Sequence, residues 1–412
     1  MASEFLRLLH VEEALELLIS RLPEGISTEE VDIETAGGRV LAEEVRATRD
    51  LPGFERSQMD GFAVRARDTF GASETMPAYL EIVGEVPMGV ESPVSLGAGQ
   101  AAYISTGGAM PEGADAVVMV EDSEVSGITV EVFKQVAPGE NVIRRDEDIA
   151  AGSPVLQKGL ALNPTHIGAL AGMGISRVTV FTLPRVAILS TGDELEPFNI
   201  EPGPARVRDV NSPALRYAVE EAGCLAVPMG IVRDRVEEMR EACSKALETA
   251  DALLLSGGSS AGVRDHTIEV VGSLGEPGVI GHGIYLKPGK PTVIGVCGDK
   301  AVLGLPGNPA SALAVFREVA EPALRRLRGE APPYRRAPRT VEAVMDRSHV
   351  SDAGRCELLP VELRDSGAGL RAVPVAGKSM LIGTLARASG QVRIPEGKEG
   401  LEAGEKVTVE LL

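Results

Sequence analysis

Strand-like apolar runs alternate with helical segments from Pro184 to Gly329, and this alternation is the strongest constraint on the fold. The predicted strands are Val186–Leu189, Leu225–Val232, Ala252–Leu255, Thr292–Val296 and Ala301–Leu305. The predicted helices cover residues 212–222, capped by Asn211 or Ser212, then residues 235–249, and then a run from Pro309 to about Arg328. Strand, loop and helix in this order predict a mostly parallel, doubly wound α/β sheet with helices on both faces.

Four loops with unusual polar content directly follow predicted strands. Ligands of doubly wound sheets bind beyond the carboxyl ends of the strands, and all four loops fall on that edge. Tight turns account for any one loop, but a shared ligand site accounts better for all four together. The candidate binding residues in these loops are Glu194, Asp234, Ser256, Gly257, Gly258, Ser259, Asp265, Pro306, Asn308 and Pro309.

The loop Ser256–Asp265 joins the strand Ala252–Leu255 to a helix-like run at Thr267–Val271. Glycines let backbone N–H groups approach a ligand, and a helix start favours an anion. A carboxylate such as Asp265 is unfavourable beside phosphate unless Mg²⁺ lies between them. An ordinary strand-to-helix turn with a capping serine fits the same residues.

Two cations lie in the segment Lys287-Pro288-Gly289-Lys290-Pro291, spaced rigidly by proline and glycine. The segment fits either a surface turn or a pair of basic anchors. With the strand-end loops, it predicts a phosphate-bearing ligand, one or more hard cations and basic groups that hold the anion.

The first half of the chain has a different organisation. Residues 1–22 predict an amphipathic helix for packing or dimerisation, since apolar residues recur at helical spacing. Short β-branched segments in residues 65–145 predict a small β-rich domain. Asp60 precedes Gly61 in a hairpin-type turn. Thr106 lies in a second glycine-rich loop, which either binds an oxyanion or only turns the chain.

The segment Asn141–Ile149 carries two arginines followed by three acids, including Asp148. It is either a solvated run of charges or a mixed contact with an anion and its cation. Residues 330–412 contain short alternating runs that predict a small β domain.

Composition excludes several classes of function. A net charge of -19 argues against a general nucleic-acid or anionic-membrane surface. The four cysteines have no C-x-x-C spacing, which indicates a reducing compartment without a zinc cluster. No apolar run approaches the roughly 20 residues that span a bilayer, and no secretory leader is recognisable. We therefore expect a soluble, cytoplasmic protein without HExxH, P-loop or GxSxG chemistry.

Taken together, the motifs resemble the MoeA family of molybdopterin molybdenumtransferases, which is related to the E domain of gephyrin. The resemblance covers nearly the whole chain, in order. The segments that carry it are residues 57–65 around Asp60, 190–194 with Glu194, 256–262 with Asp265, the Lys287–Pro291 segment and Gly304–Pro309. The family's R-x-x-G-x-D segment is altered here, because Ile143 and Asp146 replace its usual arginine and glycine near Asp148.

The resemblance implies a homodimer of multidomain subunits that combine α/β and β-rich parts. Residues 1–50 and 149–180 would form a discontinuous, helical N-terminal domain, with an inserted β-rich domain at 51–148. A MogA-like doubly wound domain at 181–329 and a C-terminal β barrel at 330–412 would follow. The site would lie between the doubly wound domain of one subunit and the β-rich domain of the other.

The reaction that the resemblance implies consumes adenylylated molybdopterin and molybdate and yields molybdenum cofactor and AMP, with Mg²⁺ required. The acids implied to hold Mg²⁺ or position water are Asp60, Glu194, Asp234 and Asp265. Lys287 and Lys290 would neutralise phosphate or molybdate, and Thr106 would bind an oxyanion. Sequence does not distinguish molybdate from tungstate.

Two other functions fit parts of the pattern. The first is a molybdopterin adenylyltransferase, which would use a similar doubly wound domain one step earlier. The second is a peptide-binding scaffold like the E domain of gephyrin. The dimer apparatus and the Ser57–Gly61 segment favour the transferase over the first, and the intact acids and lysines argue against a pure scaffold.

Overall fold

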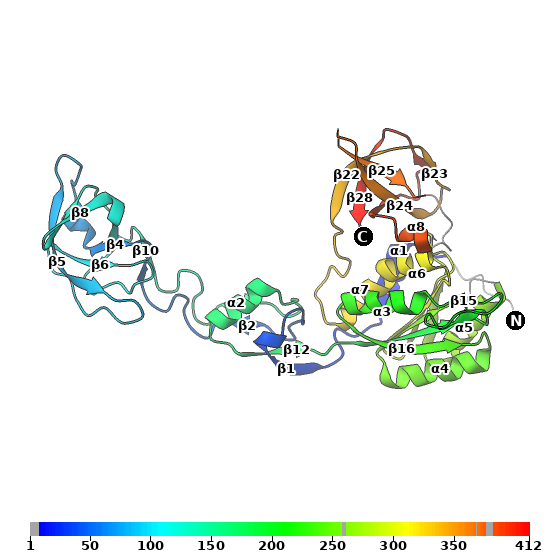
Figure 1. Ribbon diagram of the computed structural model, residues 1–412. Helices are drawn as coiled ribbons and strands as arrows, with labels where there is room; N and C mark the ends of the chain where they lie inside the picture. The colour runs from blue at the N-terminus through cyan, green and yellow to red at the C-terminus, as the bar shows by residue number, and fades with distance from the viewer. Residues whose placement is uncertain (1–7, 258–260, 368, 376–381) are drawn as a thin grey trace.

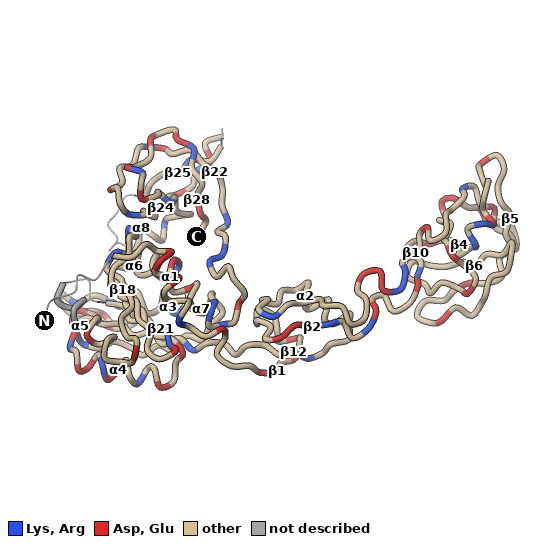
Figure 2. Tube along the Cα trace, turned by 180° about the vertical axis from the view of Figure 1, so that it is seen from behind, with Lys and Arg blue, Asp and Glu red and all other residues tan. Residues whose placement is uncertain are grey.

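The molecule is elongated, with a slender arm that extends from a two-part body (Figure 1). The computed structural model describes residues 8–257, 261–367, 369–375 and 382–412, with side chains at all of these except 261–265 and 384. We call residues 28–181 the arm and the remainder the body. Figure 2 shows the same separation from behind, with charges of both signs interspersed along the chain. No helix in these ranges is long and apolar enough to cross a membrane.

The body contains a six-stranded sheet with strand order β16-β13-β17-β21-β20-β18. These strands are β13 (Arg185–Thr191), β16 (Leu225–Val232), β17 (Ala252–Ser256), β18 (Pro277–His282), β20 (Val293–Cys297) and β21 (Lys300–Leu305). The first four strands in the sheet order are parallel, whereas β20 and β18 are antiparallel to their neighbours. All five residues of β17 are buried, as expected for a central strand covered on both faces.

Helices cover both faces of this sheet, so the predicted doubly wound fold is confirmed. One face carries α3 (Asn211–Glu221), α6 (Pro309–Val315), η4 (Phe316–Ala320) and α7 (Glu321–Leu327). The other face carries α4 (Val236–Thr249) and α5 (Ala261–Ser273). In α4, Met239, Cys243 and Ala246 repeat at helical spacing and are buried against the sheet.

The helix that follows β21 has a π turn in its middle, at η4. Proline has no N–H and its ring clashes with the carbonyl group four residues earlier in an α-helix. The π turn directly precedes Pro322 and lets the helix continue to Leu327.

The N-terminal helix α1 (Val11–Ile19) packs in the body. Val11, Ala14 and Leu18 join the core shared by α3, α6 and α7. We expected residues 1–50 to belong to the discontinuous N-terminal domain, and the structure places α1 of this range against the core of the body. The apolar periodicity showed that the helix packs, but it carries no information about its partner.

The arm consists of two small units joined by a short two-stranded ribbon. The unit near the body contains β1 (Thr28–Asp32) paired with β12 (Arg177–Phe181), η1 (Ile33–Thr35), β2 (Val45–Arg46) paired with β11 (Pro154–Leu156), and α2 (Pro164–Gly172). The ribbon is β3 (Arg56–Ser57) with β10 (Val142–Ile143). The outer unit is a sheet of order β7-β4-β6-β5-β9-β8, with β4 (Gly61–Val64), β5 (Ala78–Val86), β6 (Gln100–Ile104), β7 (Ala116–Met119), β8 (Ser123–Ser126), β9 (Thr129–Val132), η2 (Ala66–Thr69) and η3 (Val120–Asp122).

The C-terminal residues close into a β barrel. Its strands are β22 (Thr340–Met345), β24 (Cys356–Asp365), β25 (Leu370–Pro374), β26 (Gly390–Ile394) and β28 (Lys406–Leu411), and pairing of β24 with β26 closes the ring. The ribbon β23 (His349–Val350) with β27 (Gly400–Leu401) and the short helix α8 (Ile382–Leu385) complete it. A strand of the body, β19 (Leu286–Lys287), pairs with β24 and ties the barrel to the doubly wound domain.

Candidate functional site

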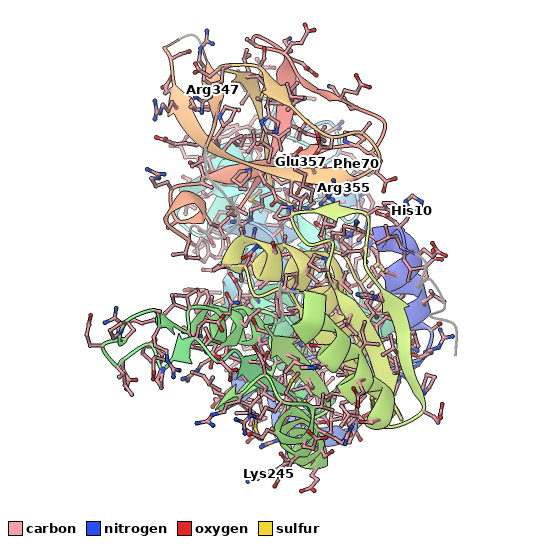
Figure 3. The ribbon with its side chains drawn as sticks, turned by 90° about the vertical axis from the view of Figure 1, so that its right-hand side faces the viewer. His10, Phe70, Lys245, Arg347, Arg355 and Glu357 are labelled. Atoms are coloured by element: carbon pink, nitrogen blue, oxygen red, sulfur yellow. The ribbon has the colours of Figure 1, made fainter. Side chains whose placement is uncertain are left out.

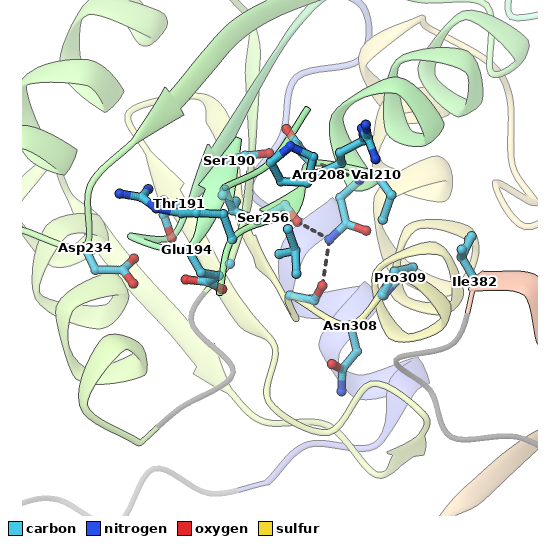
Figure 4. Close-up of a pocket in the computed structure, with 18 residues that line it drawn as sticks. Ser190, Thr191, Glu194, Arg208, Val210, Asp234, Ser256, Asn308, Pro309 and Ile382 are labelled. Carbon is cyan, nitrogen blue, oxygen red and sulfur yellow. Dashed lines mark hydrogen bonds between the residues drawn. The ribbon is translucent and has the colours of Figure 1, made fainter. Parts of the chain in front are cut away.

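A cavity of about 720 Å³ opens at the carboxyl edge of the parallel strands. The predicted strand-end loops meet there, because parallel strands end on the same edge of a sheet. The sequence-predicted residues that line it are Glu194, Asp234, Ser256, Gly257, Asn308 and Pro309 (Figure 4). Ile382, from the barrel region, contributes to the same wall.

Two buried oxygen atoms in this cavity make no hydrogen bond of regular geometry within the described part of the chain. The Thr191 hydroxyl and Oδ1 of Asp234 are buried atoms without a hydrogen bond among the described residues. Burial raises the pKa of Asp234, and the negative charges of Glu194 and Asp193 add to this effect, whereas the nearby Thr191 hydroxyl and Asp193 backbone only partly offset it. A buried, unpaired carboxylate oxygen is unfavourable, so this corner of the cavity is suited to a cation or a hydrogen-bond donor.

Gly257 allows the ends of β13 and β17 to approach closely. A Cβ at this position would lie 2.2 Å from Oγ1 and 2.4 Å from the carbonyl oxygen of Thr191. Its φ of +156° also lies in the region that side-chain-bearing residues rarely adopt. Only glycine therefore fits here, which leaves bare backbone facing the cavity.

Asn211 connects three of the loops around the cavity. Its Nδ2 donates to Oγ of Ser256 at 2.8 Å and to the carbonyl oxygen of Gly307 at 2.9 Å (Figure 4). The helix α3 starts at Asn211 after the N-cap residue Val210, and Oδ1 of Asp209, one residue earlier, accepts from the N–H groups of Asn211 and Ser212 at 3.0 and 3.1 Å. The prediction that Asn211 or Ser212 caps this helix was wrong, because the preceding acid takes that role.

Several basic residues of the cavity region escaped the sequence analysis. Arg206 and Arg208 line the cavity from the ribbon β14 (Leu195–Glu196) with β15 (Val207–Arg208). Arg233 lines a second cavity of about 700 Å³ beside it, which shares Arg206. The ribbon is an excursion between β13 and α3, so a search for loops directly after strands could not find its arginines. The only sequence signal for these arginines was their position a few residues before Asn211, at the start of the predicted helix.

Asp60 and Thr106 contact each other in the arm. Oδ1 of Asp60 accepts hydrogen bonds from the backbone N–H of Thr106 at 2.6 Å and from its hydroxyl at 2.9 Å. Both bonds lower the pKa of Asp60, with the larger effect from the backbone N–H, and they keep the carboxylate ionised. The pairing of β4 with β6 brings the two residues together. The outer unit that contains β4 and β6 lies at the end of the arm, far from the doubly wound domain of its own chain (Figure 1).

The two lysines of the Lys287–Pro291 segment are not among the residues that line the cavity. Nζ of Lys287 lies 3.2 Å from a carboxylate oxygen of Asp352 and 3.2 Å from one of Glu357, both in the barrel. Figure 3 shows Glu357 where the barrel meets the α/β layers. Glu357 is buried and its pKa is lowered, because hydrogen bonds from Ser351, His349 and Lys287 outweigh desolvation. Lys290 is exposed.

The remaining predicted site residues lie in several places. Pro306 is buried and is not among the residues that line the cavity, and Asp148 is exposed in the arm. Gly258 and Ser259 lie outside the described residues, as does the side chain of Asp265, whose backbone belongs to the first turns of α5.

The donor set of the cavity fits a hard cation. No group of three or more His, Cys, Asp and Glu side chains converges as a metal site within the described part of the chain. Mg²⁺ does not need such a group, because one or two carboxylates suffice when the phosphates of a ligand supply further oxygens. The carboxylate of Asp234 and the hydroxyl of Thr191, with Glu194 in the same cavity lining, meet that requirement.

The fold and the cavity define a doubly wound α/β protein with a cavity at the carboxyl edge of its sheet. Three family models match in order: the "MoeA N-terminal region (domain I and II)" at residues 9–174, the "Probable molybdopterin binding domain" at 187–326 and the "MoeA C-terminal region (domain IV)" at 342–412. The chain belongs to the MoeA family, and the resemblance seen in the sequence is confirmed.

Relatives across most of the chain agree with this assignment. A protein of Nostoc sp. named molybdopterin molybdenumtransferase is 37% identical over 76% of this chain and 72% of its own. One of the same name from Staphylococcus epidermidis is 30% identical over 97% of this chain and 94% of its own. The crystal structure of a molybdopterin biosynthesis MoeA protein from Pyrococcus horikoshii is 38% identical, covers 98% of this chain and 99% of its own, and superposes with a TM-score of 0.80.

Proposed function

We propose that this protein is a Mg²⁺-dependent molybdopterin molybdenumtransferase, which converts adenylylated molybdopterin and molybdate into molybdenum cofactor and AMP. The observation that carries the proposal is the buried Oδ1 of Asp234 and the buried Thr191 hydroxyl, which make no regular hydrogen bond within the described residues, in the cavity at the sheet edge. The names of the relatives support the same reaction.

The residues of the cavity have distinct roles in this proposal. Glu194 and Asp234 would hold Mg²⁺, which when bound neutralises the phosphate bridge and polarises it for cleavage. Arg206 and Arg208 would hold anionic groups of the substrate. The bare backbone at Gly257 lets the phosphates lie close to the chain.

The arm would complete the site of a partner subunit in a homodimer. Asp60 is ionised and exposed at the end of the arm, with Thr106 holding its orientation. The arm extends away from the cavity of its own chain, which favours a contact with the partner's cavity.

The activity test supplies adenylylated molybdopterin and Mg²⁺ and measures AMP while the concentration of molybdate is varied. Molybdate-dependent AMP release is the expected result. Adenylylation of free molybdopterin by ATP in its place would indicate the adenylyltransferase. If neither reaction occurs, the transferase proposal is wrong, and tight peptide binding would then favour a scaffold.

A complementation test examines the shared site separately. Asp60→Asn and Asp234→Asn are each expected to be inactive as pure dimers. Half of the dimers in an equal, fully exchanged mixture are mixed, and each would contain one intact site. The mixture should therefore regain about a quarter of wild-type activity. If the subunits have exchanged and no activity returns, the shared site is wrong. Asp60 and Asp234 then act in the site of the same chain, or one of them is not part of the site.

A further inference from the structure

The junction between arm and body is built around one aromatic ring, that of Phe181. Phe181 ends β12, and only 7% of the residue is exposed. A Cβ added at Gly25 would lie 2.2 Å from a carbon of this ring, and so would a Cβ added at Gly329. The ring therefore lies in contact with two glycines, which come from the chain before the arm and from the end of α7.

Both glycines have backbone conformations that keep them at these positions. Their φ angles are +79° at Gly25 and +77° at Gly329, in the left-handed region. Two constraints require glycine at each position, namely the positive φ and the short distance to the Phe181 ring. Nζ of Lys158 lies 5.6 Å from the ring centroid and adds a cation–π contact from the arm.

Hydrogen bonds fix the backbone on both sides of the ring. Within the arm, the N–H of Phe181 donates to the carbonyl oxygen of Val40 at 2.9 Å. From the body, Nη2 of Arg328 donates to the carbonyl oxygen of Gly38 at 2.6 Å. Arg328 is itself buried, at 5% exposure, and its Nη1 donates to the carbonyl oxygen of Ala222 at 3.0 Å.

A third close contact between arm and body lies at Gly159 and Ala331. The N–H of Ala331 donates to the carbonyl oxygen of Gly159 at 2.9 Å, and a Cβ at Gly159 would lie 2.9 Å from the same nitrogen. The arm cannot turn relative to the body without moving the Phe181 ring out from between the glycines and breaking these bonds.

From this geometry we infer that Phe181, Gly25 and Gly329 form a rigid clamp that sets the angle of the arm, and that they are positioning residues for the composite site. The inference rests on the proposed function, because a fixed angle matters only if Asp60 and Thr106 act away from their own body. A displacement of about 1 Å at a reacting group costs on the order of a hundredfold in rate. A small rotation at the junction is magnified at the far end of the arm.

Gly329→Ala tests the clamp, and Gly152→Ala is its matched control. Gly152 also has a positive φ, +82°, but a Cβ there would meet nothing within 4 Å. The control therefore carries the backbone strain of the substitution without the ring contact. Small-angle X-ray scattering of the full-length protein reports the disposition of arm and body, and AMP release reports kcat and KM.

The expected result is a changed scattering profile and a kcat lowered at least about tenfold for Gly329→Ala, with KM unchanged and Gly152→Ala like wild type. An unchanged profile for Gly329→Ala overturns the clamp, and a changed profile with normal kcat overturns the positioning role. If Gly329→Ala does not fold, Phe181→Leu provides the same comparison. If the wild-type protein releases no AMP, the proposed function fails and the scattering profile alone decides on the clamp.

Discussion

Asn211 should contribute measurably to stability, because it connects loops that follow different strands. Asn211→Ala removes the two hydrogen bonds from Nδ2, to Oγ of Ser256 and to the carbonyl oxygen of Gly307. Each such bond contributes on the order of 1 kcal/mol net, so we expect a loss of about 2 kcal/mol. Asn211 is only 8% exposed, so water does not readily replace the lost partners.

Thermal unfolding followed by calorimetry measures this loss. For a cooperative unit of the size of the doubly wound domain, about 2 kcal/mol corresponds to a Tm lower by roughly 4–8 °C. Asn211→Asp should be at least as damaging, because it keeps the shape but directs an acceptor at the carbonyl oxygen of Gly307.

Arg216→Ala is the control on the same helix. Arg216 forms an exposed pair with Glu220 at 2.9 Å, and such pairs contribute little. Its Tm should stay within about 1 °C of wild type. If Asn211→Ala lowers Tm no more than Arg216→Ala does, Asn211 does not hold the loops together as argued.

Three further predictions concern the acids and the cation. Thr106→Val removes the hydroxyl bond to Asp60 but keeps the backbone bond, so the pKa of Asp60 should rise part of the way to its ordinary value and turnover should fall about tenfold; an unchanged carboxyl titration by NMR would contradict this. In protein freed of divalent cations with EDTA, Asp234→Asn should raise the Tm at pH 7. Burial raises the pKa of Asp234, so its protonated form stabilises the fold fully below the ordinary pKa of 3.8. This stabilisation is lost as the pH rises through the raised pKa. The gain in Tm from Asp234→Asn should therefore shrink as the pH is lowered. Chelation with EDTA should abolish AMP release while the protein stays folded, and Mg²⁺ should restore the activity. Full activity in EDTA would exclude the proposed cation.

The sequence predicted the sheet and the main part of its ligand edge. Strand and helix follow from apolar periodicity, which is a local property of the chain. Parallel strands joined through helices end on one edge, so Glu194, Asp234, Ser256 and Asn308 had to meet there. The meeting of these four residues could therefore be predicted from the order of the elements, whereas Arg206 and Arg208 could not.

Tertiary structure decided the contacts between segments far apart in the sequence. Periodicity showed that α1 is amphipathic, but only packing shows that it covers the body sheet. Lys287 is a cation in a turn by its sequence, yet β19 places it beside the barrel carboxylates, away from the cavity. The junction at Phe181 carries no sequence signal, because the two glycines that contact its ring come from chain segments far from it in sequence. Local patterns show which residues are apolar, charged or flexible. The partner of each side chain depends on segments far away in the sequence, because these contacts form only when the whole chain folds.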